Sequence, residues 1–226
     1  MCSMRTRSGR WNLTRKISSK NKFSLDIGCG INHFASVNID LNPQCSPDIV
    51  ADVIHLPFKS SIFEQVFFME IIEHLNKKYE SKALKEINRV LFQSGELILT
   101  TPNNNPLFTF LDPARYLIGH RHYKKIEISN LLEVNGFEIL NIFTSGGLWQ
   151  CLTLLYNLFT IPIRKILNHS TLFFIPYFML IKANNEYKIA QEDGYTIFVK
   201  ARKEVILLRA LPRARATGEK EGGIWR

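Results

Sequence analysis

The residues most suggestive of chemistry form the short run LDIGCG, in which Asp26, Gly28 and Gly30 follow an apolar stretch. Glycine lets the backbone pass close to a ligand where a Cβ atom would collide. A nicotinamide-binding turn, G-x-G-x-x-G, would need a third glycine at position 33, which is His33. The run therefore predicts a ligand-binding turn after a strand, and a nicotinamide-dependent dehydrogenase is the least favoured interpretation. Cys29 is expected to be a small buried residue rather than a nucleophile.

Strands and helices must alternate to position this turn. Short apolar runs bounded by turn residues predict strands at residues 23–27, 37–40, 48–52, 65–69, 96–101, 137–143 and 195–199. Helical spacing of apolar residues predicts helices over residues 78–92 and 126–134. This alternation predicts an α/β fold: a Rossmann-like, mostly parallel, seven-stranded sheet with helices on both faces. Such sheets bind ligands at the carboxyl ends of their strands, so the turns there should line one edge.

Six motifs in the same order resemble those of class I S-adenosylmethionine-dependent methyltransferases, in a variant similar to methyltransferase type 11 with a short first helix. They are LDIGCG at 25–30, NID at 38–40, ADV at 51–53 with LPF at 56–58, IEHL at 72–75, GELILTTPN at 95–103 and GFEI at 136–139. The resemblance covers residues 23–143 and the last strand near 195–203. It implies the fold above and S-adenosyl-L-methionine as the cofactor.

The resemblance also implies roles for the first two strand ends. Gly28, Cys29 and Gly30 would form the turn beneath the methionine and ribose of the cofactor, and Asp26 would order that turn. Asp40 would accept both ribose hydroxyls, a task that suits the two oxygens of a carboxylate. A turn or helix cap is the alternative role for an aspartate at a strand end.

The same resemblance assigns the remaining cofactor positions. Leu41 follows the ribose-binding acid and is included among them. Asp52 would accept a hydrogen bond from the adenine amino group, and the Val53 amide would donate one to the ring. Met69 and Glu70 would pass beside the sulfonium and its methyl group.

Two departures from the family pattern concern the first turn. The third glycine of the family loop is replaced by Asn32, a residue that tolerates left-handed backbone better than most. Only nine residues separate Gly30 from Asp40. A crossover usually takes at least about 10–12 residues, so the first crossover helix should be shortened to a turn or a single short helix.

The loop that follows the fifth predicted strand reaches the same edge and carries His120 and His122. Methyl transfer depends largely on positioning, but a weak nucleophile such as a hydroxyl still needs a base. These two histidines are the candidate bases, because neutral imidazole is available near pH 7. A surface or hydrogen-bonded structural role is the alternative, and the sequence predicts no metal site.

A helical insert is predicted at residues 145–192, between the last two strands. No charged residue occurs between Glu138 and Arg164, but Pro162 and Pro176 interrupt the apolar runs. Two helices that pack on the domain as a lid, or that contact a membrane interface through residues 148–181, are favoured over a transmembrane span. We expect the sixth strand to run parallel to its neighbours, so that the insert covers the substrate edge.

The net charge of +9 is concentrated at the two ends of the chain. Residues 1–22 hold seven Lys or Arg and no acid, and residues 200–226 hold eight against three acids. These ends are interpreted as a basic N-terminal segment (1–22) and a flexible tail (204–226) around a domain at 23–203. Basic ends are solvated tails or contact an anionic membrane or nucleic acid.

The expected function is methyl transfer to a small-molecule, glycan or lipid-linked acceptor. RNA methylation is the less favoured alternative, and a non-catalytic membrane-associated protein that retains the fold is another. The four cysteines contain no CxxC pair, which argues against a zinc site or disulfide framework and favours a cytoplasmic protein, peripheral at most to the inner face of a membrane. The sequence does not determine the oligomeric state.

Overall fold

A computed structural model describes residues 9–31, 33–112, 115–116, 119–167, 177–188 and 190–205. Asn32 and most of the predicted tail, from residue 206 onward, lie outside the described residues. The strands are β1 (Ser24–Ile27), β2 (Val37–Asp40), β3 (Ile49–Val50), β4 (Phe63–Met69), β5 (Leu91–Pro102), β6 (Phe137–Ser145) and β7 (Thr196–Lys203). They form one sheet in the order β3-β2-β1-β4-β5-β7-β6, which confirms the predicted seven strands.

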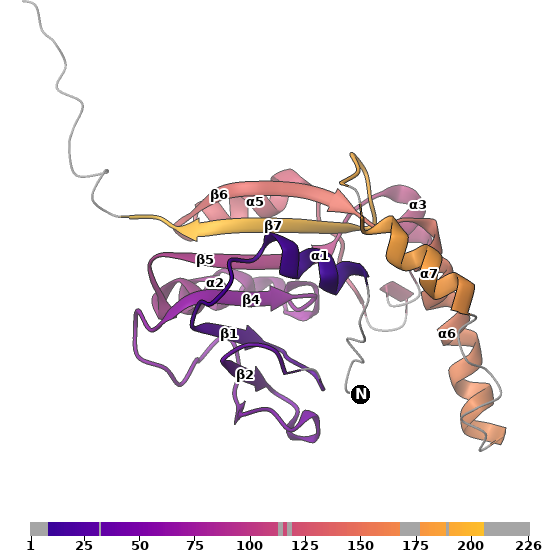
Figure 1. The fold of residues 1–226 in the computed structure, drawn as a ribbon, viewed down its shortest axis with the longest axis horizontal. Helices are drawn as coiled ribbons and strands as arrows, with labels where there is room; N and C mark the ends of the chain where they lie inside the picture. Colours follow the sequence, from indigo (N-terminus) through magenta and orange to yellow (C-terminus); the bar gives the residue numbers. More distant parts are fainter. Residues whose placement is uncertain are drawn as a thin grey trace, which may run out of the picture.

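The sheet is mostly parallel, as predicted. The pairs from β3 to β5 are parallel, whereas β7 is antiparallel to both β5 and β6. The expectation that β6 would lie parallel to its neighbour was therefore wrong, because β7 is inserted beside it. Since β7 is antiparallel to both strands, β6 still runs in the same direction as β5, and its carboxyl end opens on the predicted edge (Figure 1).

Helices lie on both faces of the sheet and at its carboxyl edge (Figure 1). They are α1 (Gly9–Ile17), α2 (Lys77–Val90), α3 (Pro106–Leu111), α5 (Lys125–Glu133), α6 (Leu148–Leu167) and α7 (Tyr177–Glu186), with the short 3-10 helices η1 (Pro43–Cys45) and η2 (Ile72–His74). Helices α2 and α5 pack on one face through buried apolar residues such as Leu84, Ile87, Ile128 and Leu132. The two insert helices α6 and α7 extend beyond the strand ends.

The opposite face is covered by α1, which the sequence analysis did not predict. The described residues between β1 and β2 form turns and no helix, as expected from the short connection. The apolar surface of Phe67 and Ile98 is instead packed against Trp11 of α1 and Phe34. The Trp11 and Phe34 rings meet edge to face with centroids 3.9 Å apart. Residues 9–17 are therefore a docked helix rather than a solvated basic tail.

One arginine fixes the short η2 turn that follows β4. The guanidinium of Arg121 donates to the backbone oxygen of Ile72 at 2.8 Å and also to that of Leu75. It pairs as well with the buried carboxylate of Glu80 on α2, which accepts from the Tyr123 hydroxyl at 3.0 Å. Carbonyl groups at the end of a short helix need such partners when they are buried. The turn is thereby held against the loop that precedes α5.

Replacing Trp11 by alanine should lower the free energy of unfolding by about 2 kcal/mol, because a half-buried aromatic leaves the sheet face. Urea unfolding of the full chain measures this. Asn12→Ala, at an exposed position of the same helix, is the control and should change stability by less than about 0.5 kcal/mol. Equal stability of the two variants would mean that α1 does not dock as described.

Replacing Arg121 by alanine should cost about 2–4 kcal/mol, since it leaves the buried Glu80 carboxylate without its cation. Arg202→Ala is the matched control, because that arginine pairs with Glu138 on the exposed side of the sheet. Exposed pairs contribute about 0–1 kcal/mol. A cost for Arg121→Ala no larger than that for Arg202→Ala, in the same unfolding assay, would contradict the proposed clamp.

Candidate active site

The glycine turn lies at the carboxyl end of β1. Gly28 and Gly30 have φ angles of 70° and 59°, in the left-handed region that favours glycine. The amides of Gly28 and Cys29 both donate to the backbone oxygen of Ile39, at 2.8 and 2.9 Å. Cys29 is buried, as expected, and its thiol lies 3.3 Å from the Gly30 backbone oxygen, whereas Cys45, on η1, is disulfide-bonded and departs from the expected reduced state. The turn is therefore tied to the neighbouring strand β2.

Asp40 at the end of β2 faces this turn. Its Oδ2 accepts from the Gly30 amide at 2.9 Å, and its Oδ1 accepts from the Asn42 amide at 2.9 Å. Each carboxylate oxygen has two lone pairs, so both retain capacity for a further donor. The next side chain, Leu41, is 67% exposed, which leaves an apolar surface beside the acid.

The other predicted cofactor-binding residues near the ends of the first three strands lie at the carboxyl edge of the sheet. Asp26 is fully buried in β1. Asp52 follows β3, is half-buried and accepts from the Ile54 amide at 3.1 Å, while Val53 is buried. Asp52 thus orders its own loop, and no contact in the structure tests its predicted role toward adenine.

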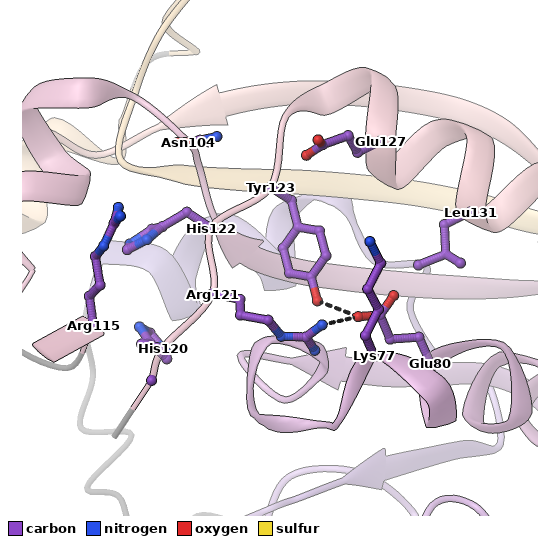
Figure 2. Close-up of a pocket in the computed structure, with 11 residues that line it drawn as sticks. Lys77, Glu80, Asn104, Arg115, His120, Arg121, His122, Tyr123, Glu127 and Leu131 are labelled. Atoms are coloured by element: carbon purple, nitrogen blue, oxygen red, sulfur yellow. Dashed lines mark hydrogen bonds and ion pairs between the residues drawn. The ribbon is translucent and has the colours of Figure 1, made fainter. Parts of the chain in front are cut away.

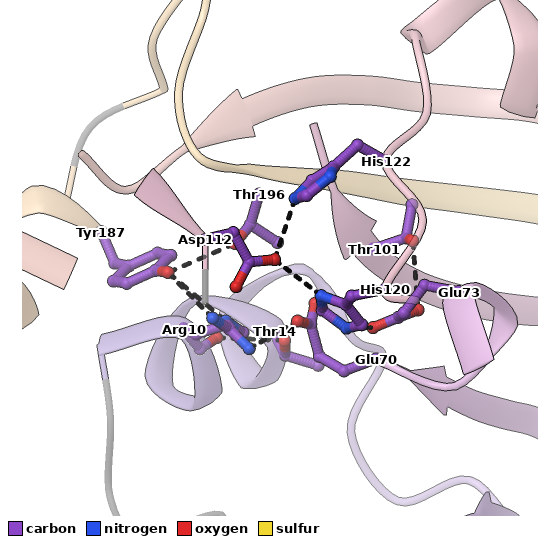
Figure 3. A network of polar contacts seen from close by, with 10 residues as sticks. All are labelled: Arg10, Thr14, Glu70, Glu73, Thr101, Asp112, His120, His122, Tyr187 and Thr196. Atoms are coloured by element: carbon purple, nitrogen blue, oxygen red, sulfur yellow. Dashed lines mark hydrogen bonds and ion pairs between the residues drawn. The ribbon is translucent and has the colours of Figure 1, made fainter. Parts of the chain in front are cut away.

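Met69 and Glu70 end β4 in the centre of the same edge. Met69 is buried, and Glu70 is half-buried with a φ of 54°, in the left-handed backbone region. Oε2 of Glu70 lies 2.7 Å from a guanidinium nitrogen of Arg10, which α1 contributes (Figure 3). Among the residues that the structure describes, none donates a hydrogen bond to the buried Oε1.

This arrangement fits S-adenosylmethionine. Asp40 retains lone pairs for a vicinal diol, and the glycine turn allows close backbone approach. The carboxylate of Glu70, with one buried oxygen that lacks a described donor, suits a positively charged sulfonium. The bound cofactor would supply an activated methyl group, and these residues would bind and orient it.

A second cluster, of acids and histidines, lies next to Glu70 (Figure 3). His120 Nδ1 donates to Asp112 Oδ2 at 2.8 Å, and His122 Nε2 lies 3.0 Å from the same oxygen. On its other side, His120 Nε2 lies 3.6 Å from Oε1 of Glu73. The structure therefore brings the two predicted bases together with two buried acids.

Burial and mutual charge shift the pKa values in this cluster. Burial, reinforced by the charge of Glu70, raises the pKa of Glu73 to about 7. Burial lowers the pKa of His120, but its hydrogen bond to Asp112 and the negative charges of Glu73 and Asp112 outweigh it and raise the pKa to about 9. His120 is then protonated near pH 7, so it does not offer the neutral imidazole on which its predicted role as a base depends. The geometry does not test that role for His122.

A pocket of about 740 Å³ adjoins this cluster, between α2, α5 and the loop before α5 (Figure 2). His120, His122 and Arg115 line one part of it, and Lys77 and Glu127 line another. Its lining does not include the described residues of the glycine turn or Asp40. The pocket lining thus contains none of the predicted cofactor positions.

Sequence reasoning missed three residues of this edge. Arg10 lay in a segment interpreted as a basic end, and neither Asp112 nor Glu73 was singled out as a partner of the histidines. Glu73 and Asp112 could have been identified as acidic residues that follow predicted strands. Arg10 gave no such signal, because no motif in the residues next to it in the sequence indicates that it packs near β4.

Comparison with known proteins agrees with this geometry. Residues 25–99 match the family described as methyltransferase domain. The uncharacterised protein MJ0638 of Methanocaldococcus jannaschii is 31% identical over 143 residues, which are 57% of this chain and 60% of that protein. MJ1252 of the same organism is 26% identical over 162 residues, 54% of this chain and 63% of that protein. This chain therefore spans less than two thirds of these relatives.

A shorter segment of this chain is similar to the probable tRNA methyltransferase 9B of Homo sapiens. The two are 27% identical over 111 residues, which are 41% of this chain and 24% of that protein. Among solved structures, a possible histamine N-methyltransferase of Thermotoga maritima has a TM-score of 0.61 at 15% identity, covering 87% of this chain and 88% of that one. The [4+2]-cyclase SpnF has a TM-score of 0.57 at 17% identity, with 87% and 81% covered. At these identities, the likeness to solved structures establishes the fold alone.

The predicted edge, the order of its motifs and the matched segment thus agree with one another. Residues 25–99 resemble the methyltransferase domain family, and the fold resembles that of solved S-adenosylmethionine-dependent methyltransferases.

Proposed function

We propose that the protein transfers a methyl group from S-adenosylmethionine to an acceptor that enters from the side of His120 and His122. The observation that carries this proposal is the hydrogen bond from the Gly30 amide to Asp40, which joins the glycine turn to the acid at the end of β2. The predicted roles of Asp26, Asp52 and Val53 toward the cofactor belong to the same proposal.

Asp40→Ala should weaken binding of S-adenosylhomocysteine about ten- to a hundredfold, because a charge-assisted contact of about 1.5–3 kcal/mol is lost. Isothermal titration calorimetry with the full chain measures the dissociation constant. Glu133→Ala removes the same charge from an exposed position near the end of α5 and should leave binding unchanged. Equal affinities of the two variants, each folded by circular dichroism, would reject the assignment of Asp40.

The acceptor is proposed to be a small molecule, a glycan or a lipid-linked compound. A lipid-linked acceptor is supported by exposed apolar side chains on the insert helices: Leu148, Phe159, Phe178 and Ile181. None of the helices described in the structure is long and apolar enough to cross a bilayer. Peripheral contact of residues 148–181 with a membrane therefore remains part of the proposal.

RNA is the second candidate acceptor. The similarity of one segment to a probable tRNA methyltransferase 9B and the basic ends of the chain favour it. Positive charge attracts any nucleic acid without specificity, so this support is weaker than a base-recognition motif would be.

Incubation with a labelled methyl donor and a cell extract, followed by separation into lipid, glycan, small-molecule and RNA fractions, identifies the acceptor class. We expect label outside the RNA fraction. Label confined to RNA, lost as salt is raised, would replace the favoured acceptor by RNA. Cofactor binding without label in any fraction would favour the non-catalytic alternative.

A further inference from the structure

We propose that Glu73, His74 and His120 bind a divalent transition-metal ion beside the candidate active site. Each of the three side chains offers one ligand atom, and these atoms all lie within 4.8 Å of one another. Imidazole nitrogens with a carboxylate oxygen suit Zn²⁺, Fe²⁺ or Co²⁺ better than Mg²⁺ or Ca²⁺, which prefer oxygen ligands.

His120 is oriented as a metal-binding histidine is. Its Nδ1 lies 2.8 Å from Asp112 Oδ2, and a carboxylate only accepts, so Nδ1 carries the hydrogen. The opposite nitrogen, Nε2, then points toward Glu73. Histidine ligands commonly donate their second ring N–H to a carboxylate in this way, which fixes the ring and raises its basicity.

Glu73 is fixed in the same manner. Its Oε2 accepts from the Thr101 hydroxyl at 3.1 Å, which leaves Oε1 directed at His120. The residue is 2% exposed, and the described ion-pair partner of Oε1 is His120 Nε2 at 3.6 Å, which is beyond hydrogen-bond distance. A buried carboxylate oxygen with so distant a partner is costly, so it favours a cation or a proton.

The separation of the two atoms suits a bridging ion. Oε1 of Glu73 and Nε2 of His120 are 3.6 Å apart, too far for a good direct hydrogen bond. Two ligands each about 2.0–2.1 Å from a tetrahedral zinc ion lie roughly 3.3 Å from one another. A small inward shift of either side chain would therefore complete the coordination.

His74 supplies the third ligand from the accessible side. Its ring centroid lies 4.8 Å from that of His120, and its side chain is exposed, so an ion can enter and exchange there. Three protein ligands leave an open coordination position, as in catalytic metal sites. If the proposed methyl transfer holds, that position would take an oxygen of the acceptor, which favours acceptors that carry a hydroxyl or carboxylate group.

A second group, Asp112, His120 and His122, also has ligand atoms within 4.8 Å of one another. It shares His120 with the proposed site. There, however, Oδ2 of Asp112 already faces both imidazoles and orients His120. We therefore assign the ion to the side of Glu73 and His74.

The test uses the full chain, freed of metal with a chelator. Co²⁺ titration followed by visible absorption, and Zn²⁺ titration by calorimetry, should each show one ion bound per chain. His74→Ala and Glu73→Gln should lower the affinity at least about tenfold. His55→Ala removes another exposed histidine, which is not one of the proposed ligands, and should leave the metal affinity unchanged.

Absence of stoichiometric Co²⁺ and Zn²⁺ binding would overturn the proposal and leave a protonated His120 between its two acids. Loss of binding in His122→Ala, with full binding in His74→Ala, would overturn it in favour of the second group. Binding of S-adenosylhomocysteine to the metal-free protein is measured separately. Its failure would count against the proposed methyl transfer without affecting the metal site.

Discussion

The carboxyl edge of the sheet depends on the compensation of buried negative charge. Glu73, Asp112 and Glu80 are all at least 95% buried, and Glu70 lies among them. Buried carboxylates are strongly unfavourable unless they are paired or hydrogen-bonded. The surrounding elements supply what they need: a guanidinium from α1, another from the loop before α5, and imidazoles from the same loop. The positions of these loops are therefore determined by charge as much as by apolar packing.

The edge divides into two halves that meet at Glu70. The glycine turn after β1 allows close backbone approach, and Asp40 at the end of β2 offers one carboxylate. This combination suits a nucleoside. The loops after β4 and β5 carry the histidines and acids beside the pocket. For the proposed methyl transfer, which depends largely on positioning, a rigid junction between the halves matters more than a strong nucleophile. The clamp made by Arg121 on η2 provides that rigidity, since it joins three carbonyl groups to a buried carboxylate.

The sequence predicted the sheet well, because apolar runs with turn residues at their ends signal strands locally. It also predicted the shortened first crossover, since nine residues leave little room for a helix. It failed at α1, whose basic residues resemble a solvated end and whose partner surface on β4 and β5 forms only in the folded sheet. The histidines were recognised by type, but the protonation of His120 depends on Asp112 and also on Glu73, which lies 47 positions earlier in the chain. Such long-range pairing has no local signal.

The docking of α1 also affects the order in which the chain can fold. The Gly9 amide donates to the Asn184 side chain, a contact that spans 175 positions. During synthesis the first helix leaves the ribosome long before its last partner exists, and at about 5–20 residues per second that interval is on the order of 10–35 s. Until then the apolar patch of Phe67 and Ile98 has only part of its cover, so the nascent chain exposes a surface on which a chaperone could act.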